Sequence, residues 1–219
     1  MNRIKRVGAV FAKAVAAGVL MAAAGLVQAL PFSAFEGRNA NGSVNNTCTA
    51  TGATACAMIY NSTLDITILN NWNIGFGFWS ATAAAGSAQA LAEAAGFAAT
   101  GLTGWVLPTG NRNMVAGALN QFKSIWNDVG GSSTGLQSEF DGVVQTGLYW
   151  YGSEFGVLLA WSFWAEFSYQ DLDHQNRRLF AVAVRSGDVV AAVPEPESLA
   201  LVLVGLVAAG ATRRRRVRA

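Results

Sequence analysis

The stretch that decides the fold is LYWYGSEFGVLLAWSFWAEFSYQDLDHQNRRLFAVAVR, residues 148–185. Apolar and polar residues alternate along much of it, with the period of two that a half-buried strand requires. We therefore expect an antiparallel β-meander with strands at Leu148 to Tyr151, Ala160 to Ser168 and Leu179 to Arg185. The polar segment from Tyr169 to Asn176 is expected to be a solvated turn.

Two helices are expected upstream of this meander. Ser80 to Ala99 is rich in alanine, and Gly101 stands where a left-handed C-cap is commonly found. A second helix is expected from about Asn111 to Val129, because apolar residues recur there at helical spacing. Its apolar stripe consists of Met114, Ala118, Leu119, Phe122, Ile125, Trp126 and Val129. Apolar and polar residues alternate from Leu64 to Leu69, so we expect one further strand there.

The basic residues lie mainly at the two ends of the chain. Of 15 lysines and arginines, four precede Ala14 and five follow Thr212. Between Leu30 and Val193 there are six basic and eleven acidic residues, a net charge of −5. This middle part has the usual length of one domain. Its acidity argues against a nucleic-acid partner.

The first 29 residues have the order of a secretory signal peptide. The positive start comprises Arg3, Lys5, Arg6 and Lys13, and Ala14 to Val27 is apolar. Small residues at Val27 and Ala29 predict cleavage by signal peptidase between Ala29 and Leu30. The alternative, a first transmembrane helix, requires a longer apolar run. We expect export by the Sec translocon through the inner membrane.

The last 27 residues, 193–219, combine three elements in a fixed order. Val193-Pro194-Glu195-Pro196-Glu197-Ser198 leads into the apolar run Leu199 to Ala211, and then come Arg213, Arg214, Arg215 and Arg216. This order fits a membrane stop with its charges on the cytoplasmic side. Thirteen apolar residues span only about 20 Å, less than a hydrocarbon core of roughly 30 Å. We therefore expect segment 198–212 to hold the protein in the membrane only transiently. The alternative is an ordinary tail anchor, which would hold it there permanently.

These three elements resemble the PEP-CTERM sorting signal. The resemblance implies that an exosortase, a membrane-embedded protease-transpeptidase, recognises the segment as the protein leaves the cell. Processing is then expected at or near Pro194-Glu195-Pro196, because each proline keeps the chain extended and disfavours a helix before it. The mature protein is expected at the cell surface or outside the cell, after a transient stay in the membrane.

Four motifs in the middle of the chain resemble the Lcl C-terminal-type domain, a C-type-lectin-like family. They are Gly104-Trp105-Val106-Leu107-Pro108-Thr109, Tyr149-Trp150-Tyr151-Gly152-Ser153-Glu154, Ala160-Trp161 and Ala181-Val182-Ala183-Val184-Arg185-Ser186-Gly187-Asp188. Val106 and Tyr151 depart from the family pattern, which commonly has Arg and Ser there. The resemblance implies an α+β fold over residues 61–190, with two helices beside a small antiparallel sheet. An N-terminal signal helix and a C-terminal hydrophobic helix would flank this domain.

The two cysteines lie in segment 30–60, which has no periodicity and is expected to be an irregular leader. An oxidising compartment allows a disulfide between Cys48 and Cys56. A zinc site is the poorer alternative, because no second pair of Cys or His residues accompanies them.

No pattern in these residues indicates an enzyme. His174 is the only histidine, and its neighbours Asp171 and Asp173 invite a catalytic hypothesis. A nucleophile triad also needs a positioned Ser or Cys and an oxyanion site, for which no motif is present. Asp171, Asp173 and Asn176 carry the oxygen ligands that Ca²⁺ prefers, but the loop lacks the Gly and Glu of an EF-hand. No cofactor is expected, and a surface calcium ion is the alternative.

Aromatic residues crowd the two neighbouring strands of the meander. Alternation places Trp161, Phe163, Ala165 and Phe167 on one face and Ser162, Trp164, Glu166 and Ser168 on the other. An exposed ring beside a carboxylate suits sugar stacking, whereas most such rings belong to the core. The candidate ligand-binding residues are Tyr151, Glu154, Trp164, Asp171, Asp173 and Asn176. We expect a non-enzymatic surface or matrix protein associated with exopolysaccharide in a biofilm; the alternative is a glycan-binding module using strand aromatics.

Overall fold

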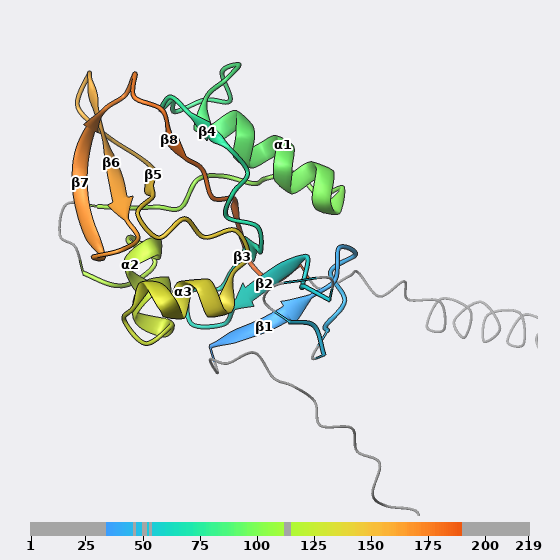
Figure 1. Cartoon of the computed structure of the whole chain (residues 1–219). Helices are drawn as coiled ribbons and strands as arrows, with labels where there is room; N and C mark the ends of the chain where they lie inside the picture. Colours follow the sequence, from blue (N-terminus) through green and yellow to red (C-terminus); the bar gives the residue numbers. More distant parts are fainter. Residues whose placement is uncertain (1–33, 46, 50–51, 53, 112–114, 190–219) are drawn as a thin grey trace, which may run out of the picture.

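The computed structural model describes residues 34–45, 47–49, 52, 54–111 and 115–189. The predicted signal peptide, its cleavage site at Ala29 and Leu30, and the C-terminal segment 193–219 lie outside these ranges. The described part holds nine strands and three helices (Figure 1).

The first sheet brings the two ends of the described chain together. Its order is β1-β2-β3-β9, and all neighbours are antiparallel. The strands are β1 (Phe35–Arg38), β2 (Met58–Asn61), β3 (Ile66–Leu69) and β9 (Val184–Ser186). Ile59, Ile68 and Val184 follow one another across β2, β3 and β9 and are buried.

The second sheet contains the aromatic meander. Its order is β4-β8-β5-β6-β7; β5 and β8 run parallel and the other pairs antiparallel. The strands are β4 (Phe76–Gly77), β5 (Leu148–Phe155), β6 (Leu159–Trp164), β7 (Tyr169–His174) and β8 (Leu179–Phe180). β7 lies at the sheet edge (Figure 1).

The helices are α1 (Ala88–Thr100), α2 (Gln121–Asp128) and α3 (Ser133–Glu139). α1 lies beside β4, whereas α2 and α3 lie together at the other end of the molecule, near β1 and β2 (Figure 1). The Ser87 side chain caps α1 by accepting a hydrogen bond from the Ala90 N–H. Gly101 ends α1 in the left-handed conformation, as its position predicts.

Two hydrophobic clusters fill the opposite faces of the second sheet. Tyr149, Tyr151 and Phe163 join the first cluster, to which α2, α3 and the first sheet also contribute. Within it, the rings of Phe122 and Phe163 stack with their centroids 4.9 Å apart. Trp150 and Ala160 point the other way, into a second cluster that includes residues of α1. Strand alternation therefore buries the meander on both faces.

The expected α+β fold, with two helices beside a small sheet as in C-type lectins, is wrong. The described chain consists mainly of two β-sheets, and its three helices are short. The second expected helix begins only at Gln121, and Leu119, placed in its apolar stripe, is 72% exposed. No helix of the described residues is long and apolar enough to span a membrane.

Four predictions about the strands are also wrong. Tyr169 to His174, expected as part of a turn, forms the edge strand β7. The single strand expected over Leu179 to Arg185 is divided between β8 and β9, which belong to different sheets. β1 and all of β2 except its last residue, Asn61, lie within segment 30–60, which was expected to be irregular. β6 ends at Trp164, so the last four residues of the strand expected over Ala160 to Ser168, among them the exposed Phe167, lie beyond it.

Two cross-links hold the first sheet. Cys48 and Cys56 form a disulfide, against which Gly37 packs so closely that no Cβ would fit. The Arg38 guanidinium, 1% exposed, donates two hydrogen bonds to the Asp188 carboxylate, at 2.9 and 2.7 Å. It also donates to Glu36 at 2.9 Å. The hydrogen-bonded Asp188 carboxylate raises the pKa of Arg38 above its usual value.

Candidate functional site

The first candidate site is one face of the strands β5, β6 and β7, which we call the aromatic–acidic face. The strand register defines three rows across it. The rows are Leu148–Trp164–Tyr169, Trp150–Ser162–Asp171 and Glu154–Ala160–Asp173. Four of the six predicted ligand-binding residues (Glu154, Trp164, Asp171 and Asp173) therefore share this face.

Its outer part, over β6 and β7, is open to solvent. Trp164 is 36% exposed, and its cross-strand neighbour Tyr169 is 51% exposed. The Trp164 ring meets the Phe167 ring edge to face, with centroids 4.9 Å apart. Asp171 is exposed in the next row. Aromatic rings and a carboxylate thus lie next to one another on an accessible surface.

The two aspartates of β7 are in different states. Asp173 is buried; it accepts a hydrogen bond from the Ser162 hydroxyl at 2.7 Å and pairs with Arg177. Asp171 accepts a hydrogen bond only from the neighbouring Leu172 N–H among the described residues. Asp171 is therefore available to an external donor, whereas Asp173 holds the surface in place.

Tyr151 does not belong to this face. It is fully buried on the opposite side of the sheet, where its hydroxyl donates to the Asn120 side chain at 2.7 Å. Burial raises the pKa of Tyr151 well above its usual range. Its prediction as an exposed ligand-binding ring is wrong. Asn176 is exposed in the turn after β7, beyond the three rows.

The β7 residues do not assemble a catalytic or metal site. His174 follows Asp173 on the strand, so its side chain points to the other face. No group of three or more His, Cys, Asp or Glu residues in the described chain could hold a metal ion. Asp171 and Asp173 share a face, but Asp173 is already committed to Ser162 and Arg177.

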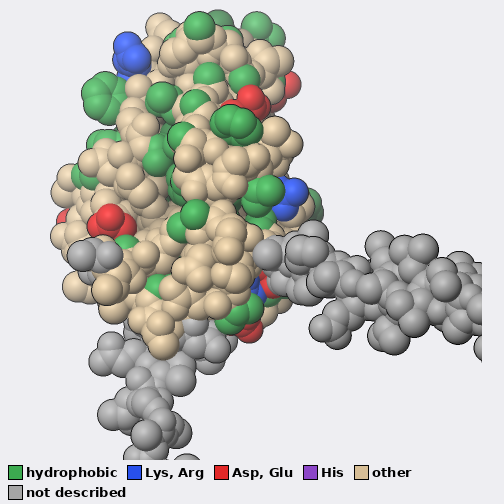
Figure 2. All heavy atoms as spheres, turned by 90° about the vertical axis from the view of Figure 1, so that its right-hand side faces the viewer, with side chains coloured by type: hydrophobic (Ala, Val, Ile, Leu, Met, Phe, Trp, Pro, Cys, Tyr) green, Lys and Arg blue, Asp and Glu red, His purple; other side chains and the backbone are tan. Residues whose placement is uncertain are grey.

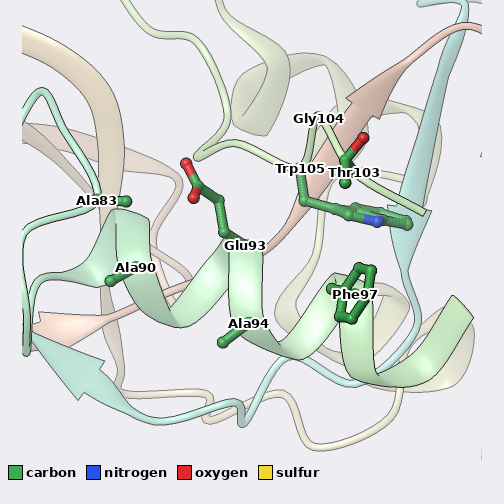
Figure 3. Close-up of a pocket in the computed structure, with 8 residues that line it drawn as sticks. All are labelled: Ala83, Ala90, Glu93, Ala94, Phe97, Thr103, Gly104 and Trp105. Carbon is green, nitrogen blue, oxygen red and sulfur yellow. The ribbon is translucent and has the colours of Figure 1, made fainter. Parts of the chain in front are cut away.

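A second candidate site is a pocket of about 400 Å³ beside α1 (Figure 3). We call it the α1 pocket; its lining residues are Ala83, Ala90, Glu93, Ala94, Phe97, Thr103, Gly104 and Trp105. It opens on the side of the molecule that carries α1, where charged side chains are scattered among hydrophobic ones (Figure 2). Phe97 is 56% exposed at its mouth.

The wall of the α1 pocket is held by Gln89. Its amide donates to Glu93 Oε1 at 2.9 Å and to the Trp105 carbonyl at 3.2 Å. Its carbonyl oxygen accepts from the Leu107 N–H at 3.1 Å. Gln89 thus orients the Glu93 carboxylate and ties α1 to the segment 105–107. The Trp105 ring packs on Gly96, where a Cβ would clash with it.

Sequence reasoning missed this pocket. The available signal was the pair Glu93 and Phe97, four residues apart and hence neighbours on one side of the predicted helix. The wall at Thr103 to Trp105 could not be inferred, since it depends on the tertiary contact through Gln89.

Comparison with known proteins identifies the signal at the C-terminus. No curated protein matches the chain. Residues 192–216 match a family model described as the PEP-CTERM protein-sorting motif. These residues include Pro194, Glu195, Pro196 and the arginines from Arg213 to Arg216, all of which were predicted to act in sorting. The chain therefore carries the sorting signal of a PEP-CTERM protein, which is exported and processed by an exosortase.

Proposed function

We propose that this chain is a non-enzymatic surface or matrix protein that associates with extracellular polysaccharide through its aromatic–acidic face. The exosortase removes the C-terminal segment at or near Pro194-Glu195-Pro196. The domain over residues 34–189 then remains at the cell surface or enters the extracellular matrix. Three features support this proposal: the sorting motif, the disulfide and the exposed rings of Trp164 and Tyr169 beside Asp171.

The adjacent exposed aromatic residues Trp164 and Tyr169 are the observation that carries the polysaccharide association. The apolar side of a sugar ring can lie on an aromatic face while its hydroxyl groups bind polar neighbours. Asp171 supplies an acceptor with no side-chain partner among the described residues. An extended surface of this kind suits a chain of sugars, because each unit adds a weak contact and the contacts add along the chain.

Processing is tested with Glu195→Gln in the native host. The glutamate is the one charge between the two prolines, so we expect the variant to remain uncleaved and in the membrane. Glu197→Gln is the matched control and should be processed normally. Intact mass of the protein recovered from cells and medium locates both the N-terminal and the C-terminal cleavage bonds. Normal maturation of Glu195→Gln would contradict a role for this residue.

Polysaccharide association is tested with the mature protein and the matrix material of the same host. We expect Trp164→Ala to lose most of the co-sedimentation with polysaccharide while keeping the fold. Leu119→Ala removes an exposed apolar side chain outside the aromatic–acidic face and serves as the control. Equal retention of the two variants would refute the proposed face and leave the processing result untouched.

A further inference from the structure

The α1 pocket has the chemistry of a small-ligand site. Its volume of about 400 Å³ lies in the range typical of pockets for small molecules. Most of its lining is apolar, and Glu93 carries the only charge among its described lining residues. Glu93 and Phe97 project from the same side of α1 toward the segment that holds Thr103 and Trp105 (Figure 3).

The pocket is organised before any ligand arrives. Ser87 and Gly101 cap the two ends of α1, and Gln89 fastens the helix to residues 105–107. Gln89 uses only one oxygen of the Glu93 carboxylate, and the second oxygen has no partner in the described part of the chain. A ligand would therefore meet a positioned, partly free carboxylate without the cost of ordering it.

The polar groups of the pocket discriminate between ligand classes. Glu93 and the Thr103 hydroxyl are the only polar side-chain groups among the described lining residues, apart from the buried indole of Trp105. A sugar would bring more hydroxyl groups than these can satisfy, and each unmatched buried hydroxyl opposes binding. A cation with an apolar body needs only a carboxylate, an aromatic ring and methyl groups.

We propose that the α1 pocket binds a small organic ammonium ion, with its charged nitrogen beside Glu93 and its apolar body against Phe97. The alanines Ala90 and Ala94 leave room for this body on the helix surface. Arg185 lies nearby, since its Nε donates to the Thr103 carbonyl at 2.9 Å, but it is not a lining residue. The proposal is independent of export and of polysaccharide association.

Titration calorimetry with the mature protein tests the proposal with a matched pair of probes. Choline carries a quaternary ammonium group, and 3,3-dimethyl-1-butanol has the same shape without the charge. We expect choline to bind saturably and the neutral alcohol to bind at least about tenfold more weakly. Choline binding should also weaken as the salt concentration rises, because Glu93 is exposed. Equal affinities of the two probes would overturn the proposal.

Variants of exposed residues locate the site without risk to the fold. Glu93→Gln keeps the shape but removes the charge, and Phe97→Leu keeps an apolar side chain but removes the ring. We expect each to weaken choline binding by about tenfold. Asp141→Asn, which removes an exposed carboxylate outside the pocket, should leave choline binding unchanged. Unchanged binding by Glu93→Gln would place the ligand elsewhere and sink the assignment.

A competition experiment separates a free ammonium ion from a protein partner. A lysine-containing peptide presents the same charged nitrogen on an apolar stem as part of a macromolecule. We expect the peptide to displace choline no better than n-butylamine does. Displacement by the peptide at a much lower concentration would show that the pocket serves a protein partner, and would overturn the small-molecule proposal.

Discussion

The two arginine–aspartate pairs among the described residues lie in regions of opposite character. Arg38 and Asp188 are 150 positions apart, and the Arg38 side chain is only 2% exposed. Arg177 and Asp173 are four positions apart beside β7, and the Arg177 side chain is 53% exposed. The first pair closes the sheet β1-β2-β3-β9; the second lies at the open edge of the meander.

This difference indicates that the first sheet serves mainly the stability of the domain, whereas the edge of the meander is available for binding. The contacts of a buried guanidinium are made away from water and are costly to lose, whereas the exposed Arg177 guanidinium can be hydrated when its pair is broken. Asp188 and Val189 are the last described residues before the matched sorting motif, which begins at residue 192. In the chain, Asp188 of the buried pair therefore lies close to the start of the sorting motif, whereas the candidate polysaccharide-binding face lies at the open edge of the meander.

The largest effect is expected from Arg38→Ala. The substitution removes hydrogen bonds to Asp188, Glu36 and the Gly37 carbonyl, together with the guanidinium that lies over the Tyr60 ring. Asp188 and Glu36, whose side chains are 22% and 51% exposed, remain accessible to water, so the cost comes mainly from the lost packing and hydrogen bonds; we expect the free energy of unfolding to fall by about 3 kcal/mol. Urea unfolding followed by circular dichroism measures this change.

Arg177→Ala is the matched control for that measurement. The buried Asp173 carboxylate keeps the hydrogen bond from the Ser162 hydroxyl but loses its partner at the other oxygen, so we expect a smaller loss of about 1–2 kcal/mol. Similar losses for the two arginine variants would remove the distinction between the closed sheet and the open edge.

Loss of the disulfide is expected to have the next largest effect, in the same closed region. The cross-link closes a loop between residues eight positions apart. Loop-closure entropy for such a short loop predicts a destabilisation of about 2–3 kcal/mol on reduction. The double variant Cys48→Ala/Cys56→Ala should reproduce the effect of the reductant, and the reductant should then have no further effect. Unchanged stability of the double variant would show that the hydrogen bonds of β1 hold this region in place without the disulfide.

Much of the meander could be predicted from the sequence, because β5 and β6 are rich in the aromatic and apolar residues that favour strands. β7 could not, because its buried positions Gln170 and Asp173 are polar. Those two residues find their partners only in the folded protein, Gln170 at Asn120 and Asp173 at Ser162. Because the buried positions of this strand are polar, its sequence shows no alternation of apolar and polar residues, and it is predicted to be a loop.

The candidate sites also differ in whether they depend on local sequence or on tertiary contacts. Trp164, Asp171 and Glu154 could be proposed from the sequence because they are aromatic or acidic residues in or next to the predicted strands of the meander. Tyr151 was misplaced because the bulge in β5 and the packing of α2 against the sheet are tertiary features. The α1 pocket depends on one buried side chain, Gln89, which bridges α1 and the segment 105–107.

Glu139, at the end of α3, makes the stability of the protein depend on pH, because its carboxyl group is buried. It is fully buried and has no hydrogen-bond partner among the described residues. Burial raises the pKa of Glu139 from 4.5 to about 8. Between these values the folded protein holds a proton that the unfolded chain releases. The stabilising contribution of protonated Glu139 should therefore be complete below pH 4.5 and should be lost as the pH rises to about 8.

Glu139→Gln should remove this pH dependence. In the wild type, the free energy of unfolding should fall by at most about 1.4 kcal/mol per pH unit within the window. The variant should be the more stable protein at the upper end and should show a flatter profile. Urea unfolding at a series of pH values makes the comparison. Parallel profiles would mean that Glu139 titrates normally and is reached by water.

The smallest effect is expected at the open edge, where Trp164 and Phe167 meet edge to face with their ring centroids 4.9 Å apart. Such pairs contribute about 0.5–1.5 kcal/mol. Each single change to alanine should therefore cost about 1 kcal/mol, and the double change should cost less than the sum. The double-mutant cycle isolates the ring contact from the loss of apolar surface. A coupling energy near zero would mean that the two rings move independently in solution. The proposed stacking surface would then be ordered only by its ligand, in contrast to the closed sheet around Arg38.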